Sequence, residues 1–77
     1  MPPRLTHHLL DRLRQRDIRE ADVLAVVARP IVEVHDPDNH SFKLFGWTVD
    51  GRKICVAVRD DSWETDDPVV KTVMEVR

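Results

Sequence analysis

The chain has little of several residue types, and each shortage excludes a class of protein. A single cysteine, Cys55, among 77 residues excludes an internal disulfide and any zinc cluster built on several cysteines. Its neighbours Ile54 and Val56 indicate a buried small apolar residue rather than a reactive thiol. No apolar run approaches the ~20 residues that span a bilayer, and residues 1–8 lack the apolar core of a secretory signal. These absences predict a cytoplasmic protein.

What is present fits one small folded domain over residues 1–77. Hydrophobic residues make up 42% and charged residues 34%, which is normal for a folded soluble domain and argues against disorder. The net charge is −2, but it is unevenly distributed. Residues 1–30 carry six arginines against four acids, whereas residues 31–77 carry six lysines and arginines against ten acids. A polyanion would therefore prefer the N-terminal part of the chain.

The apolar period changes from helical to extended at Pro30. A first helix over residues 4–16 has one apolar face, formed by Leu5, Leu9, Leu10 and Leu13. A second helix over residues 19–28, with Asp17 as its N-cap, has a core-facing stripe of Val23, Leu24, Val27 and Ala28. Alternation then predicts strands over 31–35, 41–49, 52–59 and 69–76, and Asp50-Gly51 predicts a two-residue hairpin turn. The expected fold is α+β, with two helices on one face of a roughly four-stranded antiparallel sheet.

His8, Arg12 and Arg16 recur every fourth residue in the first helix. Successive members lie about 40° apart around the helix and border its leucine face. Their stems are expected to cover the seam between helix and sheet, where Arg52 and Thr72 could meet them. The row is a candidate phosphate site. The alternative is a solubilising border that pairs with carboxylates, with His8 as a structural histidine.

The chain resembles a family of small bacterial domains of unnamed function. The resemblance rests on the spacing His-xxx-Arg-xxx-Arg-x-Ile, on a helix that ends at a proline, on the hairpin and on the terminal Thr-Val strand. That family is related to the RelE and BrnT toxins of toxin–antitoxin systems. The matching positions are His8, Arg12, Arg16, Ile18, Val23, Pro30, Gly46, Gly51, Arg52, Val56, Val58, Thr72 and Val73. The chain departs from the pattern at Asp17, where a glycine is usual, and at Arg19, where a Ser or Thr cap is usual.

The resemblance implies a RelE-like fold and a metal-independent ribonuclease without a cofactor, neutralised by an antitoxin protein. Cleavage through the 2′-hydroxyl of RNA needs a base, cations for the phosphorane charge and an acid. The candidate catalytic residues are His8, Arg12, Arg16, Arg52 and Thr72. The candidate RNA contacts are Lys53, Arg59 and, by base stacking, Trp47. The chain offers only Lys71 on its last strand, where some toxin relatives place a catalytic Tyr, His or Lys.

Aromatic residues suggest an alternative function in protein binding. Phe45 and Trp47 share one face of their strand, and Phe42 and Leu44 share the other, so one apolar face is left over once the helices cover the sheet. The alternative is thus a non-catalytic protein-interaction module, with a homodimer through the Phe45/Trp47 face. A third reading is a nucleic-acid-binding regulator. Trp63, in the acidic loop 60–68, is expected to dock onto its own domain or onto a basic protein.

The segment HDPDNH contains two histidines and two aspartates that invite a metal hypothesis. These are His35, Asp36, Asp38 and His40, and His7 in the first helix is the third histidine of the candidate set. The segment lacks the helical His pair of zinc enzymes and any thiolate ligand. Asp, Pro and Asn are better explained as turn residues, so no metal is expected.

Overall fold

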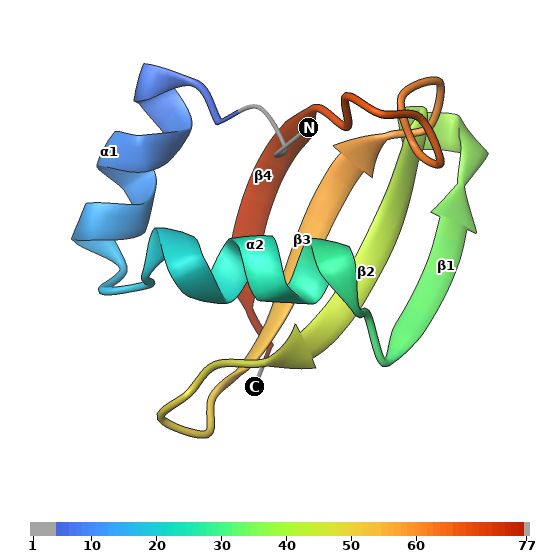
Figure 1. Ribbon diagram of the computed structural model, residues 1–77. Helices are drawn as coiled ribbons and strands as arrows, with labels where there is room; N and C mark the ends of the chain where they lie inside the picture. The colour runs from blue at the N-terminus through green and yellow to red at the C-terminus, as the bar shows by residue number, and fades with distance from the viewer. Residues whose placement is uncertain (1–4, 77) are drawn as a thin grey trace.

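The computed structural model, which describes residues 5–76, has two helices followed by a four-stranded sheet (Figure 1). The helices are α1 (His7–Gln15) and α2 (Glu20–Ala28). The strands are β1 (Val32–Asp36), β2 (Ser41–Trp47), β3 (Lys53–Arg59) and β4 (Val70–Glu75), with a short 3-10 turn, η1 (Pro37–Asn39), after β1. Each strand is antiparallel to the next, in the order β1-β2-β3-β4. The α+β architecture expected from the sequence is confirmed.

Both helices lie on the same face of the sheet, and the core fills the space between them. Figure 1 shows α2 crossing the sheet in front of β2 and β3, while α1 stands beside β4. The helices contribute Leu9, Leu13, Val23, Val26 and Val27 to the core, and the sheet contributes Leu44, Ile54, Val56, Val58, Val70 and Val73. The leucine face predicted for the first helix is therefore the buried one. In the second helix Val26 is buried, whereas Leu24 is half-buried and Ala28 is exposed, which corrects the predicted stripe.

The turn between the helices corrects the role predicted for Asp17. This residue has a φ of +55° and lies just beyond the end of α1 rather than at the start of α2. Its N–H donates to the Arg14 carbonyl, and the Ile18 N–H donates to the Leu13 carbonyl, which is the Schellman pattern that ends many helices. This left-handed position favours glycine, and here an aspartate occupies it at the end of α1. The N-cap of α2 is Arg19, whose side chain makes no capping hydrogen bond.

The β2–β3 hairpin forms at the predicted place but with a longer turn. The Thr48 N–H donates to the Arg52 carbonyl at 2.8 Å, so three residues, rather than two, lie between these partners. Gly51 ends the turn with a φ of +88°, a left-handed conformation that glycine adopts without strain. A three-residue turn ending in a left-handed residue is a common hairpin connection.

The face of the sheet away from the helices carries one continuous apolar row. The register places Val32 opposite Phe45, Phe45 opposite Cys55, and Cys55 opposite Met74, so one row crosses all four strands. We call this side of the sheet the open face. No helix within residues 5–76 is long and apolar enough to cross a membrane.

Candidate functional site

Arg52 is the centre of the polar contacts at the hairpin end of the domain. Its guanidinium donates to the backbone carbonyls of Arg16 and Asp17, which form the turn between the helices. The same group lies 3.2 Å from the Asp50 carboxylate and 3.5 Å from that of Glu75. Although desolvation opposes it, these carboxylates raise the pKa of Arg52. The side chain therefore ties the hairpin, the interhelix turn and β4 together.

Thr48 and Asp50 hold this arginine from within the hairpin. The buried Thr48 hydroxyl donates to the Asp50 carboxylate and accepts from the Arg52 N–H at 2.9 Å. The Thr48 hydrogen bond, together with the guanidinium of Arg52, lowers the pKa of Asp50. The hairpin turn thus presents an ionised carboxylate that orients the arginine.

Asp22 is a buried carboxylate that was not among the residues predicted from the sequence. It lies in the first turn of α2, is only 4% exposed, and accepts a 3.1 Å hydrogen bond from the Val49 N–H. A small pocket of about 100 Å³ beside it is lined by Asp17, Arg19, Asp22, Val49, Asp50 and Arg52. The available signal was a carboxylate within the apolar run of the second helix. The contact shows that Asp22 fixes the hairpin against α2.

Arg16 covers part of the outer edge of β4. One of its guanidinium nitrogens donates to the Val73 carbonyl at 2.6 Å. Arg16 and Arg52 also line one open hollow of about 440 Å³ together with Met74 and Glu75. Arg16 and Arg52, two of the predicted phosphate-binding arginines, are therefore neighbours, as predicted for the seam between helix and sheet. Both guanidinium groups already donate hydrogen bonds to backbone carbonyls of the protein itself.

The other members of the predicted row lie further along α1. His8 and Arg12 are exposed on the helix surface. Eight residues separate His8 from Arg16, which corresponds to about 12 Å along the helix axis. The imidazole therefore does not share the hollow in which Arg16 meets Arg52.

Thr72 lies on the opposite side of the sheet from this row. It pairs with Ala57, whereas the core residues Val56 and Val73 pair with each other on the helix side. Because side chains alternate along a strand, Thr72 points to the open face. The expectation that Thr72 meets the cations of α1 is therefore wrong, since that expectation did not include the parity of β4.

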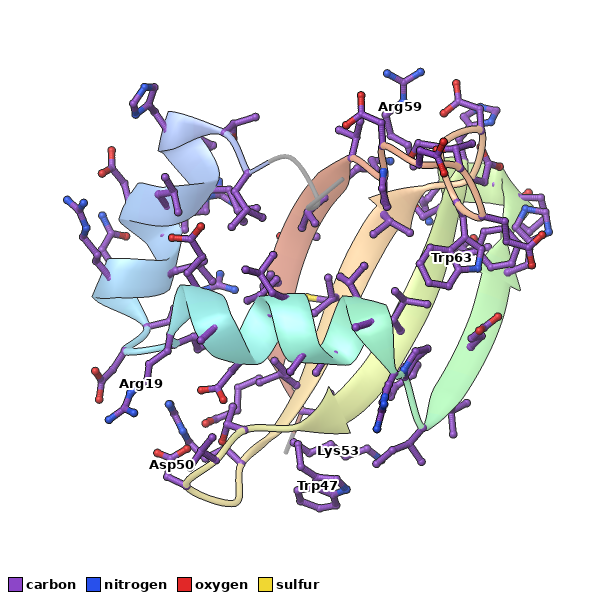
Figure 2. All side chains as sticks on the ribbon, viewed as in Figure 1. Arg19, Trp47, Asp50, Lys53, Arg59 and Trp63 are labelled. Atoms are coloured by element: carbon purple, nitrogen blue, oxygen red, sulfur yellow. The ribbon has the colours of Figure 1, made fainter. Side chains whose placement is uncertain are left out.

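The predicted RNA contacts also lie on the open face, but they do not form one cluster. Figure 2 shows Trp47 and Lys53 together near the hairpin end of the sheet and Arg59 at the other end. Arg59 bonds its own neighbour Asp61 at 2.6 Å. The Lys53 ammonium lies 5.7 Å from the centre of the Phe45 ring, a cation–π distance. Trp47 and Lys53 thus border the apolar row, and Arg59 stands apart from them.

The apolar row is buried at its centre, where Cys55 lies, and exposed toward both edges of the sheet. Cys55 is buried, as its neighbours in the sequence predicted, and this burial raises the pKa of its thiol. Val32 is 49% exposed, Met74 43% and Trp47 56%. Trp63, by contrast, packs against Phe42 on the helix side with ring centres 6.2 Å apart, so it docks onto its own domain.

Comparison with known proteins identifies one family. A family described as "Domain of unknown function (DUF4258)" matches residues 5–75, which include both helices and all four strands. No curated protein and no solved structure matches the chain. The family description gives no activity, so membership alone assigns no function to the chain.

Proposed function

This chain belongs to the DUF4258 family, and we propose that it is a protein-interaction domain that binds its partner on the open face. The observation that carries the proposal is the apolar row of Val32, Phe45, Cys55 and Met74, with Trp47 beside it. Exposed apolar residues that gather in one place mark interaction surfaces, whereas scattered ones are ordinary. Tryptophan is also the residue type most enriched among the side chains that dominate binding energy.

The chemistry of the open face favours a protein over RNA. Bases stack on aromatic rings, which this face offers at Phe45 and Trp47, whereas Val32, Val34 and Met74 offer aliphatic and thioether surface. Such side chains match the apolar residues of a polypeptide. RNA as a partner therefore belongs to the second candidate function below.

The charges around the row indicate an acidic partner. Lys53 reaches over the Phe45 ring and is the cation that a partner meets, whereas Lys43 is already paired with Asp36 at 3.3 Å on the same face. A partner segment that combines apolar residues with a carboxylate opposite Lys53 satisfies both features. A second copy would bring its own Lys53, and not a carboxylate, to this position, so the Phe45/Trp47 surface is not self-complementary at Lys53. An antitoxin, the partner implied by the RelE and BrnT resemblance, is proposed to bind here through such a segment, in the cytoplasm.

The test is a selection of peptides from a random library on the immobilised domain. We expect the enriched peptides to combine apolar and acidic residues and to shift the amide resonances of β2 and β3 on the open face. Trp47→Ala should weaken their binding by about 30-fold, a loss typical of a central tryptophan, and Lys53→Glu should shift the selection toward basic peptides.

Val49→Ala is the matched control, because Val49 is 86% exposed at the tip of the hairpin and lies outside the row. Its affinity should equal that of the wild type. Peptides that bind Trp47→Ala as tightly as the wild type would sink the proposal, as would shifts confined to the helices.

A ribonuclease is the second candidate function, and the observation that favours it is the shared hollow of Arg16 and Arg52. The activity itself is implied by the resemblance to RelE-like and BrnT-like toxins. Arginine forks suit the two oxygens of a phosphate, and His8 could move a proton at a neighbouring nucleotide. Arg12 lies between Arg16 and His8 on the helix and would hold the intervening phosphate.

Expression of the chain without a partner tests this activity. A ribonuclease is expected to arrest growth and to leave RNA ends with cyclic phosphates, and His8→Ala or Arg12→Ala should relieve the arrest while leaving the domain folded. Arg14→Ala is the control, because Arg14 is exposed and lies 4.0 Å from Asp11. Normal growth and intact RNA with the wild-type chain would end the ribonuclease proposal.

A further inference from the structure

Among residues 5–76, the hydrogen-bond ladder leaves two residues of β1 with backbone groups that pair with no other strand. In the β2–β3 pair, Asp60 donates to His40 and Thr48 donates to Arg52, so the even-numbered residues of β2 bond to β3. Ladder bonds alternate along an antiparallel strand, and the odd-numbered residues of β2 therefore bond to β1. Their partners are Val32, Val34 and Asp36. The N–H and C=O groups of Glu33 and His35, which lie between them, point outward along the edge of the sheet.

The other edge of the sheet is different. The Val76 N–H donates to the Lys53 carbonyl, and the same alternation directs the Val73 carbonyl away from β3. The Arg16 guanidinium donates a hydrogen bond to that carbonyl, and α1 packs beside β4. On the β1 side, by contrast, all residues from Ile31 to His35 are exposed. The two edges therefore differ in their capacity to accept another strand.

We infer that β1 pairs with the β1 strand of a second copy of this chain, in antiparallel orientation about a twofold axis at Val34. In this register the outward groups of Glu33 meet those of the partner's His35, and those of His35 meet those of the partner's Glu33. Four backbone hydrogen bonds form, and Val34 lies directly opposite the partner's Val34. The two sheets become one sheet of eight strands. This inference stands apart from the proposed docking on the open face, because its contact is the edge of β1.

The side chains select this register and this partner. Glu33 and His35 lie on the same face of β1, and pairing them across the axis places a carboxylate opposite an imidazole at two positions. An axis at Glu33 would instead bring two carboxylates together. A one-residue offset would place charged residues opposite valines, on the wrong faces. The His35 ring stacks on Phe42 at 4.5 Å and its Nε2 lies 3.3 Å from Asp60, so the imidazole is held on the face of β1 that it shares with Glu33.

The apolar surface supports the same arrangement. Val32 and Val34 are both about half exposed at the edge, and the paired strand covers part of each. The apolar row of one copy then approaches the row of the other across the axis. An exposed edge with apolar side chains is otherwise a site of aggregation, and pairing with a second copy satisfies it.

The first test is the mass of the protein in solution. At concentrations of hundreds of micromolar, sedimentation equilibrium should give twice the 9.0 kDa of one chain for the wild type. Val34→Lys places two ammonium groups opposite each other at the axis, and we expect its dissociation constant to rise about tenfold or more. The control is Val49→Lys, which makes the same chemical change at the 86% exposed hairpin tip and should leave the dimer intact.

A second variant gives a covalent readout. Val34→Cys is expected to form a disulfide between two copies under mild oxidation, because opposed residues at a pair without ladder bonds have neighbouring Cβ atoms. Val49→Cys should remain a monomer on a non-reducing gel, and Cys55 is buried in both variants.

Three results from sedimentation and cross-linking would overturn the inference. They are a monomeric wild type at every concentration, a Val34→Lys variant that is folded and dimerises like the wild type, and a Val34→Cys variant that forms no more cross-linked dimer than Val49→Cys. Amide exchange of the wild type is informative even if a variant fails to fold. The amides of Glu33 and His35 should be protected at high concentration and unprotected at low concentration, and equal exchange at both would also contradict the dimer.

Discussion

Replacing Leu44 with alanine is expected to lower the free energy of unfolding by about 3 kcal/mol, within the range of about 2–5 kcal/mol for this substitution in cores. Leu44 is fully buried at the centre of β2, beneath the helices, and is among the largest fully buried side chains of the described residues. The loss combines the transfer energy of the removed methyl groups with the cavity that they leave. Because a domain of this size has roughly 3–5 kcal/mol of net stability, much of the protein should be unfolded.

Urea titration followed by tryptophan fluorescence measures this loss, since Trp63 packs against the core and becomes exposed on unfolding. Val49→Ala provides the comparison, because its side chain lies outside the core and surface changes usually stay within about 0.5 kcal/mol. A Leu44→Ala variant with the wild-type urea midpoint would contradict the placement of β2 under the helices.

Gly46→Ala is expected to lower the free energy of unfolding by about 1–3 kcal/mol, the usual cost of overpacking. A methyl group added at Gly46 would lie 2.8 Å from Cγ2 of Val26 and 3.3 Å from its Cγ1. Valine has one strongly preferred rotamer in a helix, so it cannot turn away, and α2 has to move off the sheet. In a strand without this contact, the same change would be favourable or neutral.

A double-mutant cycle with Val26→Ala isolates the contact. Val26→Ala removes both methyl groups that crowd Gly46, although it leaves a cavity and is destabilising alone. The double variant should be at least about 1 kcal/mol more stable than the sum of the two single losses predicts. Strict additivity would show that the close approach of α2 to β2 at Gly46 does not set the cost.

The fold could be predicted from the sequence because its pattern changes at one residue, Pro30. Apolar residues follow a helical period before it and alternate after it, so the number, type and order of the elements are confirmed. The details that failed depend on backbone geometry. Aspartate is a residue type that often caps the start of a helix. Asp17 instead ends α1 in a left-handed conformation, which places Ile18 in the core. Likewise, the Asp-Gly signal located the hairpin but not the length of its turn.

The candidate site was less predictable, because it depends on which way each strand faces. The helical wheel placed Arg16 beside the sheet, and the structure brings it to Arg52. It could not place Thr72, whose side depends on the pairing of β4 with β3. Nor could it find Asp22, whose partner is a backbone N–H at the hairpin, 27 residues away. Contacts between distant backbone groups leave little trace in composition or periodicity.

The unequal edges of the sheet have a consequence for how large an assembly can grow. A sheet with two free edges can add further copies at both ends, which is the geometry of a fibril. Within residues 5–76, the arginine contact with the Val73 carbonyl and the packing of α1 cover part of the β4 edge, so we expect a further strand to add at β1. If β1 pairs as inferred, we expect growth by edge pairing to stop at two copies and to close with twofold symmetry. In this arrangement the N-terminal helix, besides carrying a row of cations, has the further effect of limiting the size of the assembly.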